Sequence, residues 1–347
     1  MNERIQSLPV LVLDVYSRCN CRCVMCDIWK RDAARELSFE NLSRQLPSIG
    51  RLGVEWVVLT GGEPLMHPDL FRLCDPLRRR GIRITLLTTG LLLERFAQQV
   101  AANIDDIIVS LDGPREIHNR IRRVKNAFEL LAAGIRAIRS RNPRFPIAAR
   151  STVQRANCAF LSETVAAARE LGCDSISFLA ADTHSSAFDH HAPLNNLDEI
   201  RLSPEDIASL SAEIERVIDS GECGRFVAET PEKLRRIADH ARWALGMDDP
   251  VAPRCNAPWV SAVMDGEGFV RPCFFHPPIG RAGASDPLDV VLNGPEALAF
   301  RGALNIAENP VCRRCVCSLN YRATAQKGST PSDCSPIRRS EPPAPLP

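Results

Sequence analysis

The chain has 347 residues, and its 43 Lys and Arg side chains almost balance its 42 Asp and Glu side chains. A net charge of +1 excludes the strong positive field that attracts nucleic acids or anionic membranes, so we expect neither as a partner. No apolar stretch reaches the roughly 20 residues that a membrane helix needs, and the amino-terminal apolar run is too short for a signal peptide. We therefore expect a cytoplasmic protein without a transmembrane segment.

The first part of the chain alternates short β-branched apolar runs with longer amphipathic segments. This pattern predicts repeated strand–helix units around a parallel sheet, and hence an α/β fold. The predicted strands are residues 11–16, 55–60, 82–88, 106–112, 147–153 and 175–181. The predicted helices are residues 40–52, 69–80, 93–102, 126–139 and 161–171. Gly81 and Gly172 follow two of these helices, where a carboxy-terminal cap favours positive φ, so both mark helix-to-strand turns.

The pattern changes after residue 181. A long polar loop leads to a predicted helix at residues 204–219, which Ser203 is expected to cap, and a further helix is predicted at residues 232–245. A small cysteine-bearing domain follows. The tail, residues 321–347, is rich in Pro and Ser and is predicted to be disordered.

Four of the 14 cysteines fall within residues 19–26, in the loop that leaves the first predicted strand. Cys19, Cys23 and Cys26 form a C-x3-C-x2-C triplet, which can hold one face of a cubane cluster and leave the fourth iron without a protein ligand. A closed ferredoxin-type site uses four cysteines, whereas an open coordination position is typical of a catalytic metal centre. The alternatives are a zinc site or a group of reduced thiols. Cys21 lies too close to its neighbours to complete a zinc tetrahedron, and we expect it to be a spectator.

This triplet in this loop resembles the signature of the radical S-adenosylmethionine (SAM) superfamily. The resemblance implies a [4Fe–4S] cluster on Cys19, Cys23 and Cys26, with the amino and carboxylate groups of SAM on the free iron. In that family an electron from the reduced cluster breaks the sulfonium–C5′ bond, and the resulting 5′-deoxyadenosyl radical abstracts hydrogen from a substrate. Met25 stands where the family often has an aromatic residue, and it can still pack against the cofactor.

A second motif, Gly61-Gly62-Glu63-Pro64, follows the second predicted strand directly. The two glycines let the backbone approach a ligand closely, Glu63 supplies a carboxylate, and Pro64 starts the next segment. Taken alone, the motif is equally consistent with an ordinary turn. It is similar to the GGEP motif of the radical SAM superfamily, which implies that its backbone and carboxylate receive the ammonium group of SAM.

Five further residues lie at the ends of predicted strands and are candidate SAM contacts: Thr88, Ser110, Asp112, Arg150 and Ser151. Ser110 and Asp112 match a family position that can meet the ribose or the carboxylate of SAM. The Arg150 guanidinium could pair with the SAM carboxylate, because its fork geometry fits that group. A purely structural role at a strand end is equally open for each of the five.

The carboxy-terminal cysteines predict a second metal centre. Cys255 and Cys273 bracket a predicted β-hairpin that turns at residues 265–268, and Cys312 and Cys315 add a C-x2-C pair. These four thiols could surround a cubane cluster or a structural zinc ion. They resemble the single-cluster twitch form of the accessory domain of radical SAM enzymes, which implies one auxiliary [4Fe–4S] cluster.

The larger SPASM form of that domain continues with further cysteines, whereas position 321 here is Tyr321. Cys317 and Cys334 remain unassigned, and either could be a substitute ligand. Four isolated cysteines are expected to pack as small apolar residues: Cys74, Cys158, Cys173 and Cys223. Four histidines near the predicted site are more often surface residues than functional groups: His118, His184, His190 and His191.

Together these features predict a partial (β/α)6 barrel like an incomplete TIM barrel, with a small carboxy-terminal twitch-like iron–sulfur domain. The expected division is a core barrel at residues 1–202, a helical connection at 203–250, an auxiliary-cluster domain at 251–320 and the tail. The resemblance implies a radical SAM oxidoreductase that oxidises or cross-links a peptide or small molecule, with flavodoxin or ferredoxin as electron donor. The alternatives are a redox-neutral isomerase or epimerase with a structural second cluster, and a non-catalytic iron–sulfur or zinc-binding protein.

Overall fold

The computed structural model describes residues 3–31, 33–185, 187–188 and 196–321. The predicted disordered tail beyond residue 321 lies outside the described residues, as do His190, His191 and Cys334. In the described part of the chain, no helix is both long enough and apolar enough to cross a membrane.

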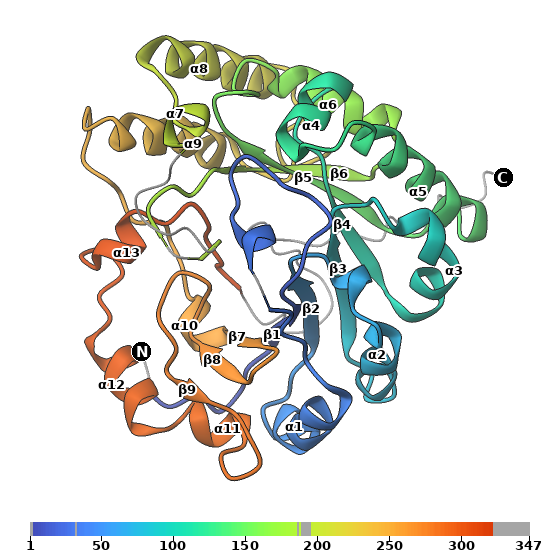
Figure 1. Ribbon diagram of the computed structural model, residues 1–347. Coiled ribbons are helices and arrows are strands. Elements are labelled where there is room, and N and C mark those ends of the chain that lie inside the picture. The colour runs from blue at the N-terminus through green and yellow to red at the C-terminus, as the bar shows by residue number, and fades with distance from the viewer. Residues whose placement is uncertain (1–2, 32, 186, 189–195, 322–347) are drawn as a thin grey trace, which may run out of the picture.

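Six parallel strands form the centre of the fold (Figure 1). They follow the chain order β1 to β6, and each pairs with the strand before it. Their bounds are Val10–Tyr16, Trp56–Gly61, Arg83–Thr88, Asp106–Ser110, Ile147–Val153 and Ser175–Ala180. Each predicted strand is therefore confirmed, with ends that differ by two residues at most.

Amphipathic helices cover the outer face of this curved sheet. They are α1 (Phe39–Arg51), α2 (Leu70–Arg78), α3 (Leu93–Asn103), α5 (Ala127–Arg141) and α6 (Leu161–Glu170). Alternate strand residues such as Leu11, Leu13 and Val15 are fully buried against them, as the two-residue strand period requires. Gly81 and Gly172 have φ of +71° and +82°, as predicted for helix-to-strand turns.

Two longer helices follow β6. Helix α8 (Pro204–Asp219) begins with a capping box in which the Ser203 hydroxyl accepts from the Asp206 N–H and the Asp206 carboxylate accepts from the Ser203 N–H. Helix α9 (Pro231–Ala244) begins at Thr230, whose hydroxyl accepts from the Lys233 N–H. The two helices pack against each other, and α9 contacts β6, so they cover the free edge of the parallel sheet.

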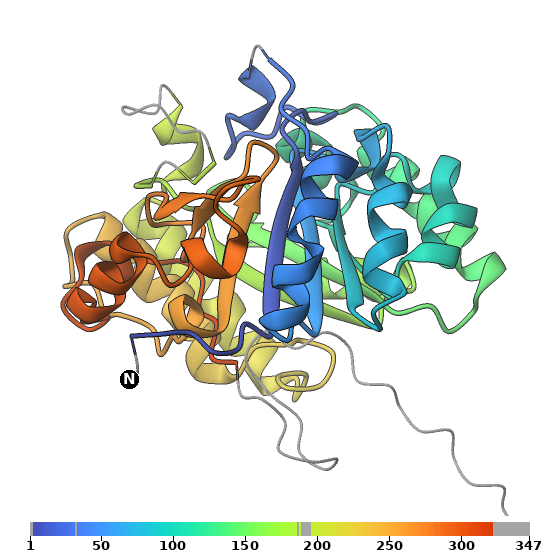
Figure 2. The same cartoon turned by 90° about the horizontal axis from the view of Figure 1, so that it is seen from below.

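The carboxy-terminal region continues the same sheet. Strand β7 (Ser261–Asp265) pairs in parallel with β1, from Val10↔Ser261 to Asp14↔Asp265. Antiparallel β8 (Phe269–Arg271) and β9 (Gly280–Arg281) complete the sheet, so the predicted hairpin is confirmed. In Figure 2 these strands, drawn in orange, lie beside the dark blue β1. The second cysteine region is therefore joined to the barrel through main-chain hydrogen bonds.

The structure also contains short elements that the sequence pattern did not predict. They are η1 (Ile28–Lys30), η2 (Pro64–Met66), α4 (Arg115–Arg122), α7 (Leu197–Ile200), α10 (Ala257–Val260), α11 (Leu288–Val291), α12 (Pro295–Ala303) and α13 (Pro310–Arg313). Most of them lie after strand ends or in the carboxy-terminal region, where they position the candidate site residues.

Candidate functional site

The loop with Cys19, Cys23 and Cys26 leaves the carboxyl end of β1 and is fixed by the loop that leaves β2. The Gly62 N–H donates to the Tyr16 carbonyl at 2.7 Å, and the Glu63 N–H donates to the Arg18 carbonyl at 2.8 Å. A Cβ atom on Gly62 would lie 2.2 Å from the Arg18 carbonyl oxygen, and one on Gly61, where φ is +146°, would lie 2.3 Å from the Tyr16 carbonyl oxygen. Both glycines are therefore required by the close approach of the two loops.

The Glu63 carboxylate is completely buried, and neighbouring groups of the protein use its oxygens. It accepts from the Thr89 N–H at 2.7 Å, from the Thr89 hydroxyl at 2.6 Å, from the Thr88 hydroxyl at 2.9 Å and from the Leu65 N–H at 3.0 Å. Burial raises the pKa of Glu63, and these donors oppose that rise. Glu63 and Thr88 thus tie the loop after β2 to the end of β3.

Arg122, at the end of α4, is a site residue that the sequence analysis missed. Its Nη1 lies 3.5 Å from the Cys23 Sγ, and its Nη2 lies 2.6 Å from the Asp112 Oδ2. Asp112 is completely buried, and its Oδ1 accepts from the Thr152 N–H at 2.9 Å. The structure therefore places Asp112 in a buried ion pair that holds a cation against the cysteine loop.

Helix α4 also contacts the cysteine loop through its backbone. The Arg22 N–H donates to the Arg122 carbonyl at 3.3 Å, and the Val24 N–H donates to the Ile121 carbonyl at 3.0 Å. The sequence signal for α4 was weak because this helix has only eight residues and half of them are charged. A search for basic residues after the fourth strand would have included Arg122.

The environment of the triplet favours the thiolate form of Cys23 and opposes that of Cys26. The pKa of Cys23 is lowered to about 7, first because the Cys21 thiol hydrogen-bonds to it and also because Arg122 lies beside it, and these effects outweigh burial. Burial raises the pKa of Cys26. Met25 packs in an apolar cluster with Val24 and Ile121 around the cysteines, which limits access of water to the loop. Since the thiolate is the metal-binding form of cysteine, the residues present fit an iron–sulfur cluster.

Ser110, Arg150 and Ser151 do not all lie on one face of the sheet. Ser110 pairs with Arg150, which pairs with Ser177, and the Arg150 Nε donates to the Ser177 Oγ at 3.2 Å. Arg150 forms no ion pair with any described residue, so its charge is available to an anionic group. Ser151 follows Arg150 along β5 and points to the opposite, helix-covered face, where it is 1% exposed.

The four predicted carboxy-terminal ligands line a single cavity: Cys255, Cys273, Cys312 and Cys315. They come from the segment before α10, the segment after β8, and α13 with its following turn. Backbone N–H groups face two of the thiols, since the Ala257 N–H lies 3.5 Å from the Cys255 Sγ and two amides beyond Cys273 hydrogen-bond to its sulfur. Cys317 does not line this cavity, but its carbonyl accepts from the Cys315 thiol at 2.8 Å.

Four thiols that line one cavity provide the ligands for either of the two predicted groups. A tetrahedral zinc site binds its four ligands within about 2.3 Å of one point, whereas a cubane cluster binds each thiolate on a different iron. The residues present therefore fit an iron–sulfur cluster as well as a zinc ion.

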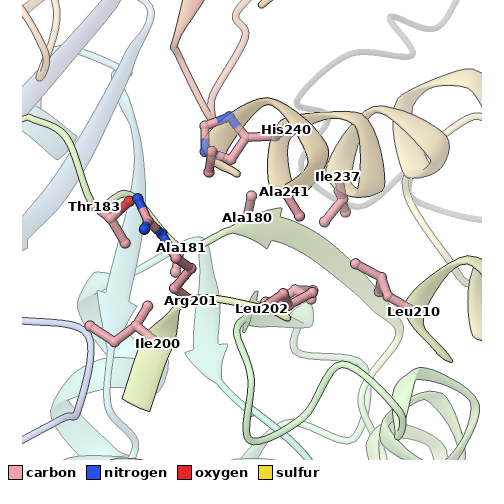
Figure 3. Close-up of a pocket in the computed structure, with 12 residues that line it drawn as sticks. Ala180, Ala181, Thr183, Ile200, Arg201, Leu202, Leu210, Ile237, His240 and Ala241 are labelled. Carbon is pink, nitrogen blue, oxygen red and sulfur yellow. The ribbon is translucent and has the colours of Figure 1, made fainter. Parts of the chain in front are cut away.

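A second cavity lies beyond the end of β6. Figure 3 shows Thr183 and Arg201 at one end, His240 of α9 above, and an apolar wall that includes Leu202 and Leu210. The His240 Nε2 is buried without a hydrogen-bond partner among the described residues. Next to the cavity, the His184 ring lies 4.4 Å from the Trp243 ring, and the Arg314 guanidinium lies over Trp243.

The remaining predicted residues are mostly structural in their placement. Cys74, Cys158 and Cys173 are buried in the core, and Cys223 packs against it, as predicted for small apolar residues. His118 is fully buried beneath the cysteine loop, where its Nδ1 accepts from the Asp112 N–H at 3.2 Å. Burial lowers the pKa of His118 to about 3, so the ring is neutral.

Family models match two parts of the chain. Residues 13–152 match the radical SAM superfamily, and residues 255–316 match SPASM, an iron–sulfur cluster-binding domain. The resemblance to the radical SAM superfamily, with an iron–sulfur cluster-binding domain after it, is therefore confirmed. The first match contains the triplet loop, the GGEP motif and Arg150, and the second contains the four-cysteine cavity. These domains imply a [4Fe–4S] cluster with SAM in the barrel, and further iron–sulfur binding in the carboxy-terminal region.

Curated proteins that are similar to this chain match different lengths of it. An AdoMet-dependent heme synthase from Methanosarcina barkeri is 31% identical over 168 residues, which is 47% of this chain and 48% of that protein. A PqqA peptide cyclase from Ruegeria pomeroyi is 26% identical over 322 residues, which is 88% of this chain and 79% of the cyclase. The chain spans less than half the length of the heme synthase and of two other tetrapyrrole synthases.

Solved structures share the whole fold. Streptococcus suis SuiB bound to S-adenosylmethionine has a TM-score of 0.64 at 15% identity, over 91% of this chain and 74% of SuiB. Native anSMEcpe with bound AdoMet has a TM-score of 0.63 at 18% identity, over 89% of this chain and 86% of that one. The prediction of a partial barrel with a small second domain is therefore confirmed at the level of the fold.

Proposed function

We propose that this chain is a radical SAM enzyme in which Cys19, Cys23 and Cys26 bind the cluster that activates SAM, and in which an auxiliary [4Fe–4S] cluster binds in the carboxy-terminal cavity. When bound, the first cluster and SAM supply a one-electron cleavage that starts hydrogen abstraction from a substrate. The proposal depends chiefly on one observation: Cys23, the central thiol of the triplet, lies beside the Arg122 cation, inside a region that matches the family.

The residues of the chain have distinct roles in this proposal. Gly61 and Gly62 fix the cysteine loop because only glycine allows the close approach of its neighbours. Arg122 stabilises the Cys23 thiolate, and Asp112 holds Arg122 in place. Arg150, which has no carboxylate partner in the described residues, binds the carboxylate of SAM, and Ser110 lies beside it on the same face. Met25 packs beside the cofactor and excludes water.

We further propose a peptide substrate that is oxidised or cross-linked. The PqqA peptide cyclase match covers 88% of this chain and so reaches into both regions that match family models, whereas the tetrapyrrole synthase matches cover half of the chain or less. SuiB, which shares the fold, has been solved with its precursor peptide SuiA. Flavodoxin or ferredoxin would supply the electron.

The test uses full-length protein reconstituted with iron and sulfide without oxygen. Wild-type protein should release 5′-deoxyadenosine from SAM when a strong reductant is added, and the Cys19→Ala/Cys23→Ala/Cys26→Ala variant should release none. Cys223→Ala is the matched control, because it removes a thiol that packs against the core and is not assigned to a cluster. Cleavage by the triple variant at the wild-type rate, or wild-type protein without iron, would contradict the proposal.

The substrate class is tested separately. Libraries of peptides made from deuterated amino acids are incubated with the active enzyme, and deuterium in 5′-deoxyadenosine is measured by mass spectrometry. Transfer from a peptide supports the proposal, and the mass of the product then distinguishes oxidation from a redox-neutral reaction, because oxidation removes two hydrogens. Transfer from deuterated small molecules alone would refute the peptide assignment.

A further inference from the structure

His276 lies beside the four-cysteine cavity and is held in a fixed orientation. It follows Cys273 by three residues, and only 6% of its surface is exposed. The Phe300 ring of α12 packs edge-on against it, with 4.9 Å between the ring centroids and 69° between the ring planes. His276 is also one of the residues that line the cavity. Packing against neighbouring side chains therefore fixes the orientation of the His276 ring.

The His276 ring reaches one of the predicted ligands. Its Nε2 lies 3.4 Å from the Cys312 Sγ, within hydrogen-bond distance for sulfur. A cysteine that binds iron has lost its thiol proton, so in the loaded site the hydrogen between these two atoms has to be carried by the imidazole. The ring would then donate its Nε2–H to the Cys312 thiolate.

The other three thiols have backbone hydrogen-bond partners, and the Arg236 cation also interacts electrostatically with Cys315. In the described part of the chain, Cys255 and Cys273 receive backbone N–H groups, and the Cys315 thiol contacts the Cys317 carbonyl. Hydrogen bonds to cluster sulfurs raise the reduction potential, because the reduced cluster is more negative and gains more from the donor. One side-chain donor could therefore adjust the potential without changing the ligand set.

We propose that His276 is a positioning residue of the auxiliary centre, which donates a hydrogen bond to the Cys312 thiolate and raises the reduction potential of the cluster. This inference rests on the proposed auxiliary [4Fe–4S] cluster. In this role His276 binds no iron and contacts no substrate, and it acts only through the Cys312 sulfur. A higher potential would help the cluster accept an electron from the substrate after hydrogen abstraction.

The experiment measures the auxiliary cluster alone, in full-length protein with Cys19→Ala, Cys23→Ala and Cys26→Ala. In this background the midpoint potential is determined by redox titration with electron paramagnetic resonance. His276→Phe removes the donor and keeps an aromatic ring against Phe300. We expect its one-electron reduction to be about tenfold less favourable, which is a shift of about 59 mV to lower potential for a one-electron couple. His276→Gln, which keeps an N–H donor, should recover part of the shift.

His184→Phe is the matched control, because it removes another histidine near the carboxy-terminal region, one that packs on Trp243 and lies outside the four-cysteine cavity. An unchanged potential in His276→Phe would overturn the inference, as would nitrogen hyperfine coupling that identifies His276 as an iron ligand. A triple variant that binds no iron would instead overturn the auxiliary cluster itself, and with it this role of His276. Iron analysis therefore separates failure of the proposed function from failure of the inference.

Discussion

The two cysteine regions of this molecule are held in different ways. The triplet loop contacts the loop after β2, the end of α4 and the segment after β6, where the Asn196 amide donates to the Val24 carbonyl at 2.6 Å. The four carboxy-terminal cysteines lie on short elements around a cavity, and their thiols have mainly backbone partners. The barrel itself therefore fixes the first site, whereas the second site depends more on the group that its thiols bind.

Removal of metal should reveal the largest difference between the two regions. Chelation of iron from the anaerobic full-length protein is expected to lower the free energy of local opening at residues 272–279 and 304–316, around the four-cysteine cavity, by about 3 kcal/mol or more, because metal binding there contributes to folding. The amides of β1 to β6 should keep their protection, since their core is apolar and continuous. Hydrogen exchange with mass spectrometry measures both. Equal loss of protection in both regions would show that the barrel depends on its metal as much as the carboxy-terminal site does.

Arg122→Met tests how much the buried ion pair of Arg122 with Asp112 stabilises the triplet loop. The substitution leaves the completely buried Asp112 carboxylate without its cation, and we expect the free energy of unfolding to fall by about 3 to 5 kcal/mol in urea denaturation. The control is Arg120→Met on the same helix, where the side chain is exposed and the expected change is within about 0.5 kcal/mol. Equal effects of the two substitutions would show that the ion pair does not stabilise the loop.

Gly62→Ala tests the contact between the loops after β1 and β2. The new methyl group would overlap the Arg18 carbonyl, so we expect a loss of about 3 kcal/mol in stability together with reduced iron binding by the triplet. In Gly81→Ala the methyl group enters open space, and only the positive φ opposes it, at a cost of about 1 kcal/mol. If Gly62→Ala kept its iron and its stability, the two loops would have to be less tightly packed than the structure indicates.

The sequence predicted those parts of the fold whose signals are local. The six parallel strands and their long helices follow from hydrophobic periodicity, and the capping of α8 follows from Ser203 and its neighbours. The parallel pairing of β7 with β1 could not be predicted, because its partners are distant in sequence and the pairing is decided by packing. Helix α4 was not predicted for a related reason. It has only eight residues, and its backbone contacts the cysteine loop, which is distant in sequence.

For the site, the sequence located the cysteines and the motif but not their partners. The spacing of Cys19, Cys23 and Cys26 and the GGEP motif are local patterns. The hydrogen bonds of Glu63 with Thr88 and Thr89, and the ion pair of Asp112 with Arg122, join different strand–helix units. Only the folded chain brings those groups together.

The smallest expected effect concerns His240, which lies at the boundary between the barrel and the carboxy-terminal region. Burial lowers its pKa to about 4, and the nearby His184 and Arg236 oppose protonation while Asp182 favours it. Above the ordinary pKa of about 6.5 both the folded and the unfolded states are neutral, so the full stability is present. Below it the unfolded chain binds a proton that folded His240 does not, and stability falls by about 1.4 kcal/mol per pH unit until about pH 4.

His240→Phe should remove this contribution and keep the aromatic packing against Trp243. Between pH 7.5 and 5.5, wild-type protein is therefore expected to lose about 1.4 kcal/mol more than the variant in urea denaturation. The other histidines are present in both proteins, so the difference reports on His240 together with its electrostatic interaction with His184. Equal losses of stability in the two proteins would mean that water reaches the His240 ring and that the boundary between the two regions is open. The contrast between a site fixed by the barrel and one fixed by its metal would then be weaker.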